Sequence, residues 1–129
     1  MLFRSDVNSD GRPDLVVTHR DARISILLNR GKGRLARAPG SPFGLSARPF
    51  AVGVADLDRD RRADLVAATV NSVSALLGDG RAFPRAKRAT VPAGPGAYDI
   101  AIGDIDEDGR PDVVASSFES DAVTVLVGR

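Results

Sequence analysis

The chain has 129 residues, of which 43% are hydrophobic, 27% charged and 5% aromatic. It contains no cysteine, which excludes a disulfide scaffold, a thiolate zinc site and a cysteine nucleophile. No apolar run is long enough to cross a membrane as a helix, and the N-terminus lacks the apolar core of a signal peptide. We therefore expect a single domain over residues 1–129, without a membrane span.

The net charge of +1 hides a strong segregation of charge. Eleven of the 15 aspartates fall in three short windows, whereas the 18 basic residues are spread along the chain and 16 of them are arginine. The near-neutral net charge therefore results from a few dense acidic clusters in a chain that is otherwise basic.

The chain is built from repeats of about 48–50 residues, over approximately 1–48, 49–96 and 97–129. The first begins with a short strand before Asp6, and continues through an acidic window (6–17), an alternating strand (23–28), a glycine turn (31–33) and a Pro-flanked segment (36–49). The second has a strand at 50–55, its window at 56–67, and then a strand at 72–77, a glycine turn at 78–80 and a Pro-flanked segment at 86–96. The third has strands at 98–103 and 122–127 around the window 104–115.

These segments are predicted to be strands, since they are short, rich in Val, Ile, Leu and Thr, and separated by Gly, Asn, Asp and Pro. The Pro-flanked segments have room for a fourth strand. A period near 50 residues with about four strands is typical of a β-propeller blade; an open solenoid or a sandwich of hairpins is the alternative. Because propellers close with four to eight blades, about three repeats indicate a fragment, a homo-oligomer that completes the propeller, or an open stack.

The second window places carboxylates at loop positions 1, 3, 5 and 9, which are Asp56, Asp58, Asp60 and Asp64. A tight loop brings such alternate side chains together, and the carbonyl of Arg62 at position 7 can complete the shell. Several hard oxygens around one point suit calcium better than magnesium, which keeps its waters. Four carboxylates without a cation would repel one another. The window therefore predicts a calcium site.

The windows differ from an EF-hand because position 12 is not Glu and strands follow instead of helices, so a structural site is expected rather than a sensor. Position 6 requires a residue that tolerates positive φ, and is Gly11, Arg61 or Gly109. In the first loop Asn8 replaces one carboxylate. By ligand count the third loop should bind best, with Asp104, Asp106, Asp108 and Asp112.

The motif Asp-x-Asp/Asn-x-Asp-Gly-x-x-Asp, followed by Leu-Val-Val and later by Val-Leu-Leu-Gly, resembles the FG-GAP/VCBS repeat family over nearly the whole chain. The resemblance implies calcium-bearing propeller blades that serve adhesion or ligand binding, usually outside the cell. It also implies up to three Ca²⁺ ions, with side-chain ligands at Asp6, Asn8, Asp10 and Asp14, at Asp56, Asp58, Asp60 and Asp64, and at Asp104, Asp106, Asp108 and Asp112, and backbone carbonyl ligands at Arg12, Arg62 and Arg110.

The sequence offers little for catalysis, so no enzyme activity and no catalytic residue are expected. His19 is the one imidazole, with Ser25 and Asp21 as the nearby triad candidates, and is interpreted as a surface or turn residue. Phe3, Phe43, Phe50, Phe83 and Tyr98 are interpreted as anchors that pack the blades, and nucleic acid is not expected as a partner. The leading hypothesis is a calcium-stabilised module that binds a protein or glycan. Alternatives are an accessory region of a secreted enzyme, an Arg-rich binder of anionic glycans, and a purely structural scaffold.

Overall fold

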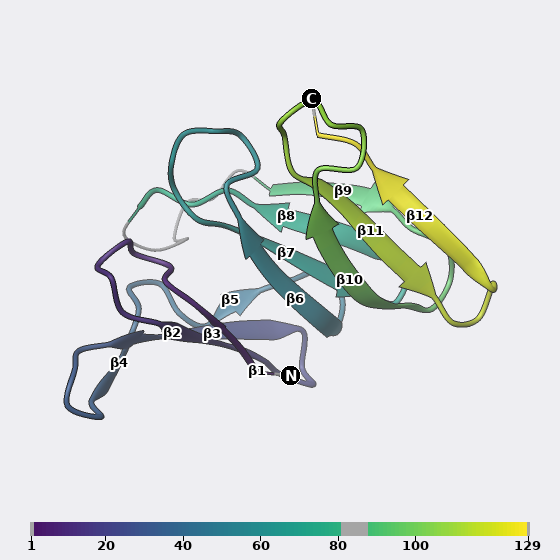
Figure 1. Ribbon diagram of the computed structural model, residues 1–129. Helices are drawn as coiled ribbons and strands as arrows, with labels where there is room; N and C mark the ends of the chain where they lie inside the picture. The colour runs from purple at the N-terminus through teal and green to yellow at the C-terminus, as the bar shows by residue number, and fades with distance from the viewer. Residues whose placement is uncertain (1, 81–87, 129) are drawn as a thin grey trace.

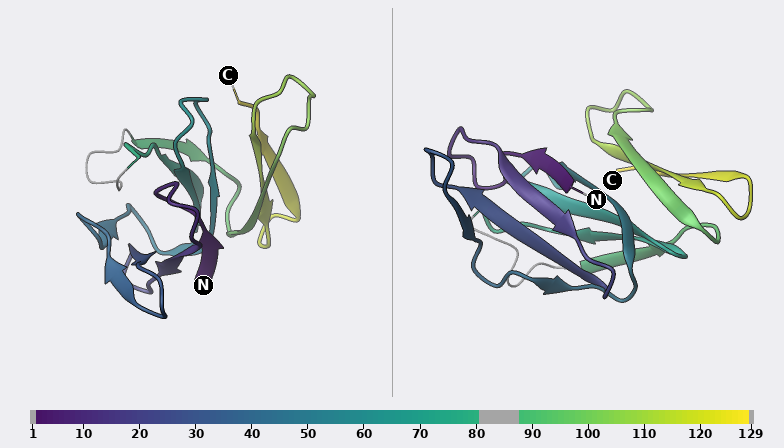
Figure 2. Two further views of the ribbon diagram at one scale, coloured as in Figure 1. Left: turned by 60° about the vertical axis from the view of Figure 1, so that its left-hand side comes forward. Right: turned by 90° about the horizontal axis from the view of Figure 1, so that it is seen from below.

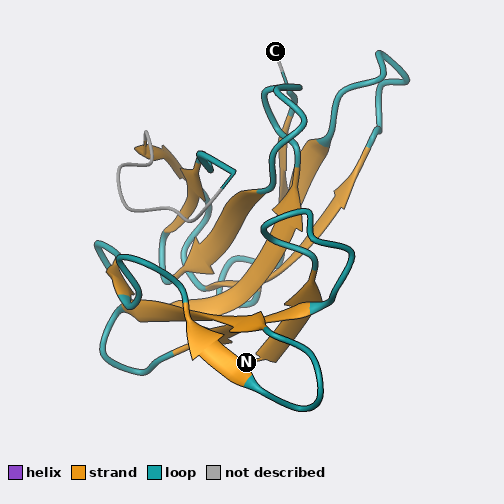
Figure 3. Cartoon of the chain, turned by 90° about the vertical axis from the view of Figure 1, so that its left-hand side faces the viewer, coloured by secondary structure: helices purple, strands orange, loops and turns teal. Residues whose placement is uncertain are grey.

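A computed structural model describes residues 2–80 and 88–128 of the chain. In these residues the secondary structure consists of β-strands joined by loops and turns (Figure 3). No helix of the described part has the length and hydropathy needed to cross a membrane.

The strands form three antiparallel sheets, one for each sequence repeat (Figure 1). The first sheet has the order β1-β2-β3-β4, with β5 also paired to β3, and contains β1 (Leu2–Ser5), β2 (Asp14–Thr18), β3 (Arg23–Asn29), β4 (Leu35–Arg37) and β5 (Phe43–Gly44). The second sheet has the order β6-β7-β8-β9 and contains β6 (Pro49–Ala55), β7 (Asp64–Thr69), β8 (Ser72–Leu76) and β9 (Arg88–Pro92). The third has the order β10-β11-β12 and contains β10 (Ala97–Gly103), β11 (Asp112–Ser117) and β12 (Ala122–Leu126).

The second sheet is packed between the other two, as the views in Figure 2 show. All six residues of β7 are buried, because its alternate side chains enter two different cores. Leu65 and Ala67 join the core shared with the first sheet, and Val66 and Ala68 join the core shared with the third. A Cβ atom on Gly53 would lie 2.8 Å from Cδ1 of Ile102, so glycine allows β10 to approach β6 closely. The stacked, twisted sheets are the expected propeller blades, and they do not close into a ring.

The fourth strand of the first sheet is split, which the sequence reasoning did not predict. β4 and β5 pair with opposite ends of β3, and the break between them contains Pro39, Gly40 and Pro42. A proline cannot donate a ladder hydrogen bond. In the break, the N–H of Ala38 donates to the Ile26 carbonyl (2.9 Å), and the Ile26 N–H donates to Oγ of Ser41 (2.9 Å). The Ser41 hydroxyl therefore replaces a backbone acceptor where the strand is interrupted.

The third sheet leaves one face open to solvent. Val123 and Val125 on β12 are 66% and 47% exposed, whereas the equivalent positions of β8 lie in or beside the core. The expected short strand before Asp6 is present as β1, which has four residues where β6 and β10 have seven. β1 pairs with β2 along its whole length.

Candidate metal centre

The three acidic loops join the first strand of each sheet to the second, so they lie at the same end of the three sheets (Figure 1). In each loop the position 1 carboxylate accepts the backbone N–H of position 6. The donor and acceptor are 2.8 Å apart for Gly11 and Asp6, 2.9 Å for Arg61 and Asp56, and 2.8 Å for Gly109 and Asp104. This bond curls the loop around its first carboxylate.

Two further turns within each loop keep alternate side chains on its inner side. The position 5 carboxylate accepts the backbone N–H of position 7, at 2.9 Å from Arg12 to Asp10, 2.8 Å from Arg62 to Asp60 and 2.8 Å from Arg110 to Asp108. The position 3 oxygen accepts the N–H of position 5 in all three loops, at 3.1–3.3 Å. Such side-chain to backbone bonds favour turns over strand pairing. These bonds explain why the chain leaves the first strand at the acidic window and enters the second strand only after it.

Two positions of every loop have positive φ. Position 6 was predicted to do so, and has φ of 80° at Gly11, 67° at Arg61 and 80° at Gly109. Position 4 does so as well, at Ser9 (58°), Arg59 (63°) and Glu107 (61°), and sequence reasoning missed it. A left-handed non-Gly residue costs about 1–2 kcal/mol. The second loop carries arginine at both positions and is therefore the most strained of the three.

The position 9 aspartates have a structural role that the sequence reasoning also missed. Asp14, Asp64 and Asp112 are completely buried. In each, Oδ2 accepts the N–H of loop position 2, at 2.7–2.9 Å. Oδ1 accepts the N–H of a residue at or just beyond the end of the third strand, at 2.8 Å from Asn29, Gly78 or Gly128. The carboxylate therefore links the loop to the third strand of its own sheet.

The pKa values of two of these buried carboxyls shift in opposite directions. Burial raises the pKa of Asp64, against the two backbone N–H groups it accepts, and the nearby charges of Asp58 and Asp60 raise it further. Hydrogen bonds from the Gly128 and Ile105 N–H groups lower the pKa of Asp112. The carboxylates of Asp58 and Asp60 therefore lie close enough to Asp64 to repel its charged form.

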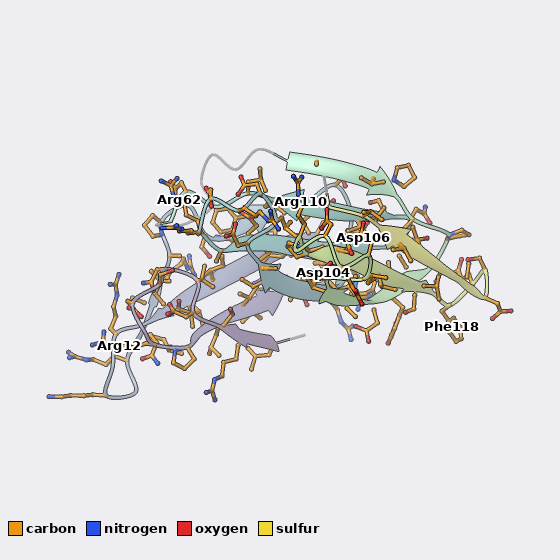
Figure 4. All side chains as sticks on the ribbon, turned by 45° about the horizontal axis from the view of Figure 1, so that its top comes forward. Arg12, Arg62, Asp104, Asp106, Arg110 and Phe118 are labelled. Carbon is orange, nitrogen blue, oxygen red and sulfur yellow. The ribbon has the colours of Figure 1, made fainter. Side chains whose placement is uncertain are left out.

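Carboxylates converge in two of the three loops. One oxygen each of Asp56, Asp58 and Asp64 lies within 4.8 Å of the others, and the same is true of Asp104, Asp106 and Asp108. Figure 4 shows Asp104 and Asp106 together on the loop between β10 and β11. Among the described residues the first loop brings no such trio of carboxylates together. There the amide of Asn8 donates to Oδ2 of Asp10 at 3.3 Å.

One oxygen of the second cluster has no partner among the described residues. Oδ1 of Asp56 is buried and accepts no hydrogen bond, whereas Oδ2 accepts the Arg61 N–H. A buried carboxylate oxygen left unpaired costs about 1–3 kcal/mol or more. This oxygen lies in a loop whose other carboxylates repel it. A bound cation would give it a partner and would also reduce that repulsion.

The position 7 arginines do not neutralise these clusters. Their guanidinium groups are 3.9, 3.8 and 3.7 Å from the position 5 carboxylates of the same loops, with side chains 41–53% exposed. Exposed ion pairs of this kind contribute about 0–1 kcal/mol. Arg59 instead reaches the next loop, where its Nη2 donates to the Asp108 carbonyl at 3.3 Å, and its guanidinium covers Gly109. The second and third loops are therefore in contact.

Three further candidates from the sequence lie at the other end of the sheets, namely His19, Phe43 and Tyr98. Nε2 of His19 is 2.8 Å from Oγ of Ser25, but the Asp21 carboxylate pairs with Arg23, which lowers the pKa of Asp21. Asp21, the nearby acid that a triad would require, is therefore engaged by Arg23. Phe43 is buried as expected of an anchor. Tyr98 is 63% exposed, yet its ring stacks on Phe50 of β6, so this pair joins the second and third sheets as expected of packing anchors. The side chain of Phe3 and all of Phe83 lie outside the described part.

Comparison with protein families gives a match to the FG-GAP-like repeat over residues 6–67 and again over 56–115. Comparison with curated proteins gives no match. The two matched stretches include all three acidic loops and most of the three sheets, and the all-β architecture agrees with propeller blades. The chain therefore belongs to the FG-GAP-like repeat family.

Proposed function

We propose that the acidic loops bind calcium and that the chain is a calcium-stabilised, non-catalytic module for adhesion or ligand binding. The observation that carries the metal proposal is the buried, unpartnered Oδ1 of Asp56 in a cluster with Asp58 and Asp64. Buried polar groups in folded proteins are paired with protein, water or ions. A hard cation is the partner that also removes the repulsion between the three carboxylates.

The second loop supplies a ligand set of the size calcium uses. Asp56, Asp58, Asp60 and Asp64 provide carboxylates, and Arg62 provides a backbone carbonyl. Five protein groups and water reach the six to eight oxygens that calcium takes at about 2.3–2.6 Å. Magnesium is less suited, because it retains water and demands an octahedron. The bound ion would join the end of β6 to the start of β7.

The other two loops are proposed to bind calcium in the same way. The third offers Asp104, Asp106 and Asp108, which converge as in the second, together with Asp112 and the carbonyl of Arg110. The first offers Asp6, Asp10, Asp14 and the carbonyl of Arg12, with the Asn8 amide oxygen at position 3. With one charge fewer and no convergent trio, it should bind more weakly. Up to three ions per chain are therefore expected.

The position of the acidic loops, each between two strands of one sheet, favours a structural role for the proposed ions and a role in recognition for the module. Each ion would stiffen a loop between two strands, and the stiffened sheets present the turns of the opposite end as a binding surface. An extracellular or cell-surface location is proposed because the chain belongs to the FG-GAP-like repeat family. The open face of the third sheet, with Val123 and Val125 exposed, is proposed to pack against another copy of the chain.

The test is thermal unfolding in excess calcium, in excess EDTA, and in EDTA with excess magnesium. A ligand that binds the native state alone raises the stability with its concentration, by about 2.7 kcal/mol at 100 times Kd. We expect the midpoint to be highest in calcium and lowest in EDTA. An identical midpoint in calcium and in EDTA would refute a structural metal, and an equal rise in magnesium would refute the preference for calcium.

A further inference from the structure

A second site lies at the end of the sheets opposite the acidic loops. Here the end of β2 meets the starts of β6 and β10 around an open pocket of about 550 Å³. Because β6 has seven residues and a strand rises about 3.3 Å per residue, the pocket is about 20 Å from the second loop. Its side chains with chemical function are His19, Arg20, Arg48, Phe50, Tyr98 and Asp99. The proposed calcium ions do not account for this group.

The wall of the pocket is an aromatic stack at the surface. The rings of Phe50 and Tyr98 stack with centroids 5.6 Å apart and planes 30° apart. Tyr98 is nevertheless 63% exposed, so most of its side chain remains accessible to a ligand although it packs on Phe50. The guanidinium of Arg48 lies 5.0 Å from the centroid of Phe50. An exposed aromatic face of this kind is a platform for a flat, partly apolar ligand.

The charges around the stack are arranged for an anion that also carries hydroxyl groups. Among the described residues, neither Arg20 nor Arg48 has a carboxylate oxygen within 4.0 Å of its guanidinium nitrogens, so neither forms an ion pair there. Asp99 uses Oδ1 to accept the Ile100 N–H at 2.9 Å. Its carboxylate has further lone pairs for hydroxyl donors. An arginine fork binds carboxylate or sulfate with two parallel hydrogen bonds.

We propose that this pocket binds an acidic oligosaccharide, and the proposal extends the ligand-binding role given above. The C–H face of a pyranose ring packs on the exposed ring of Tyr98, which Phe50 supports from the protein side. A carboxylate or sulfate on the sugar pairs with Arg48 and Arg20, and neighbouring hydroxyls donate to Asp99. The volume of about 550 Å³ fits a short oligosaccharide, since it lies in the 300–1,000 Å³ range of small-ligand pockets. A polyphosphate is disfavoured because Asp99 would face its charge.

The test is isothermal titration calorimetry of the full chain in calcium with three tetrasaccharides. A hyaluronan tetrasaccharide carries carboxylates, a chondroitin sulfate tetrasaccharide also carries sulfates, and chitotetraose is neutral. We expect at least one acidic sugar to bind about tenfold or more tightly than chitotetraose, since only an acidic sugar has an anionic group that can form charge-assisted hydrogen bonds with Arg48 and Arg20. Tighter binding of the chondroitin sugar would assign sulfate as the preferred anion. Equal binding of chitotetraose, or no binding of any sugar at millimolar concentration, would overturn the proposal.

Two pairs of variants separate the pocket from general surface effects. Arg48→Gln is matched by Arg34→Gln, an exposed arginine outside the pocket, and Tyr98→Ala is matched by Phe118→Ala. Phe118 is 83% exposed and lies at the end of its sheet away from Asp104 and Asp106 (Figure 4). We expect the pocket variants to weaken binding about tenfold and the matched variants to leave it unchanged. An equal loss in Arg34→Gln would indicate incidental charge and overturn the proposal.

Two measurements on the same samples keep the outcomes distinct. Amide chemical shifts of wild-type protein should move at Arg48, Tyr98 and Asp99 on addition of the acidic sugar; movement confined to other residues would overturn the site. Thermal midpoints in calcium and in EDTA report the metal proposal independently. Calcium-dependent stability without sugar binding would refute the pocket alone, whereas sugar binding without calcium-dependent stability would refute the metal alone.

Discussion

Substitution of Asp56 by asparagine tests the metal proposal at the atom that motivates it. The side-chain amide of the introduced asparagine would keep one oxygen to accept the Arg61 N–H, so the curl of the loop should survive. The substitution removes the negative charge from a cluster in which Oδ1 is buried without a partner among the described residues. In the metal-free protein the change should be neutral or stabilising, because it relieves repulsion from Asp58 and Asp64. In calcium it should be destabilising, because it removes a ligand.

The expected size follows from linkage. One ion at 100 times its Kd stabilises the native state by about 2.7 kcal/mol. For a chain of this length, 1 kcal/mol shifts the midpoint by about 4 °C, so one ion corresponds to about 10 °C. The difference between wild type and Asp56→Asn should therefore be about 10 °C larger in calcium than in EDTA. In EDTA the midpoint of Asp56→Asn should equal or exceed that of wild type.

The assay is a calorimetric scan of both proteins in each buffer. Asp121→Asn is a matched control, since Asp121 is exposed in a turn at φ 48°, a conformation that Asn accepts. The control should behave as wild type in both buffers. The same loss of stability by Asp56→Asn in calcium and in EDTA would refute the reasoning, because the carboxylate would then act through protein contacts alone.

Three further results are expected. Arg61→Gly should raise the free energy of unfolding in EDTA by about 0.5–1 kcal/mol in denaturant titrations, because glycine adopts a φ of 67° without strain. Arg59→Gly should raise the free energy of unfolding by less, since it also loses the hydrogen bond to the Asp108 carbonyl. A larger gain in Arg59→Gly would contradict the strain argument. In EDTA, the raised pKa of Asp64 makes stability fall as the pH rises through and above the ordinary value of 3.8, whereas the lowered pKa of Asp112 makes stability fall as the pH drops below that value. Asp64→Asn should remove the first pH dependence of the unfolding midpoint, measured at about pH 3–7, and Asp112→Asn should remove the second. A pH profile that neither variant changes would contradict the two pKa shifts. Light scattering in calcium should give a mass above that of one chain, and a compact monomer would contradict packing of Val123 and Val125 against a second copy.

The repeat was readable in the sequence because each structural step has its own local signal. Alternating apolar residues predicted the strands, and three aspartate windows in register predicted the loops that join them. These features depend on neighbours in the chain, so they need no knowledge of the tertiary structure.

Features that depend on distant residues could not be predicted in this way. The double hydrogen bonding of Asp64 requires the N–H of Gly78, which comes close only when β8 has paired with β7. Whether an aromatic side chain is buried depends on which residues of other strands pack against it. Phe43 is buried and Tyr98 on β10 is exposed, although both stand among apolar residues in the sequence. The split of the fourth strand did have a signal, which was the pair Pro39 and Pro42 in so short a segment.

Native mass spectrometry of the chain, sprayed with and without calcium, tests the central claim most directly. It counts the bound ions and the subunits together. We predict up to three calcium ions per chain, with the second and third sites filled first and one ion fewer in Asp56→Asn. Spectra that show no ion retained in calcium, with wild type and Asp56→Asn identical, would contradict the account.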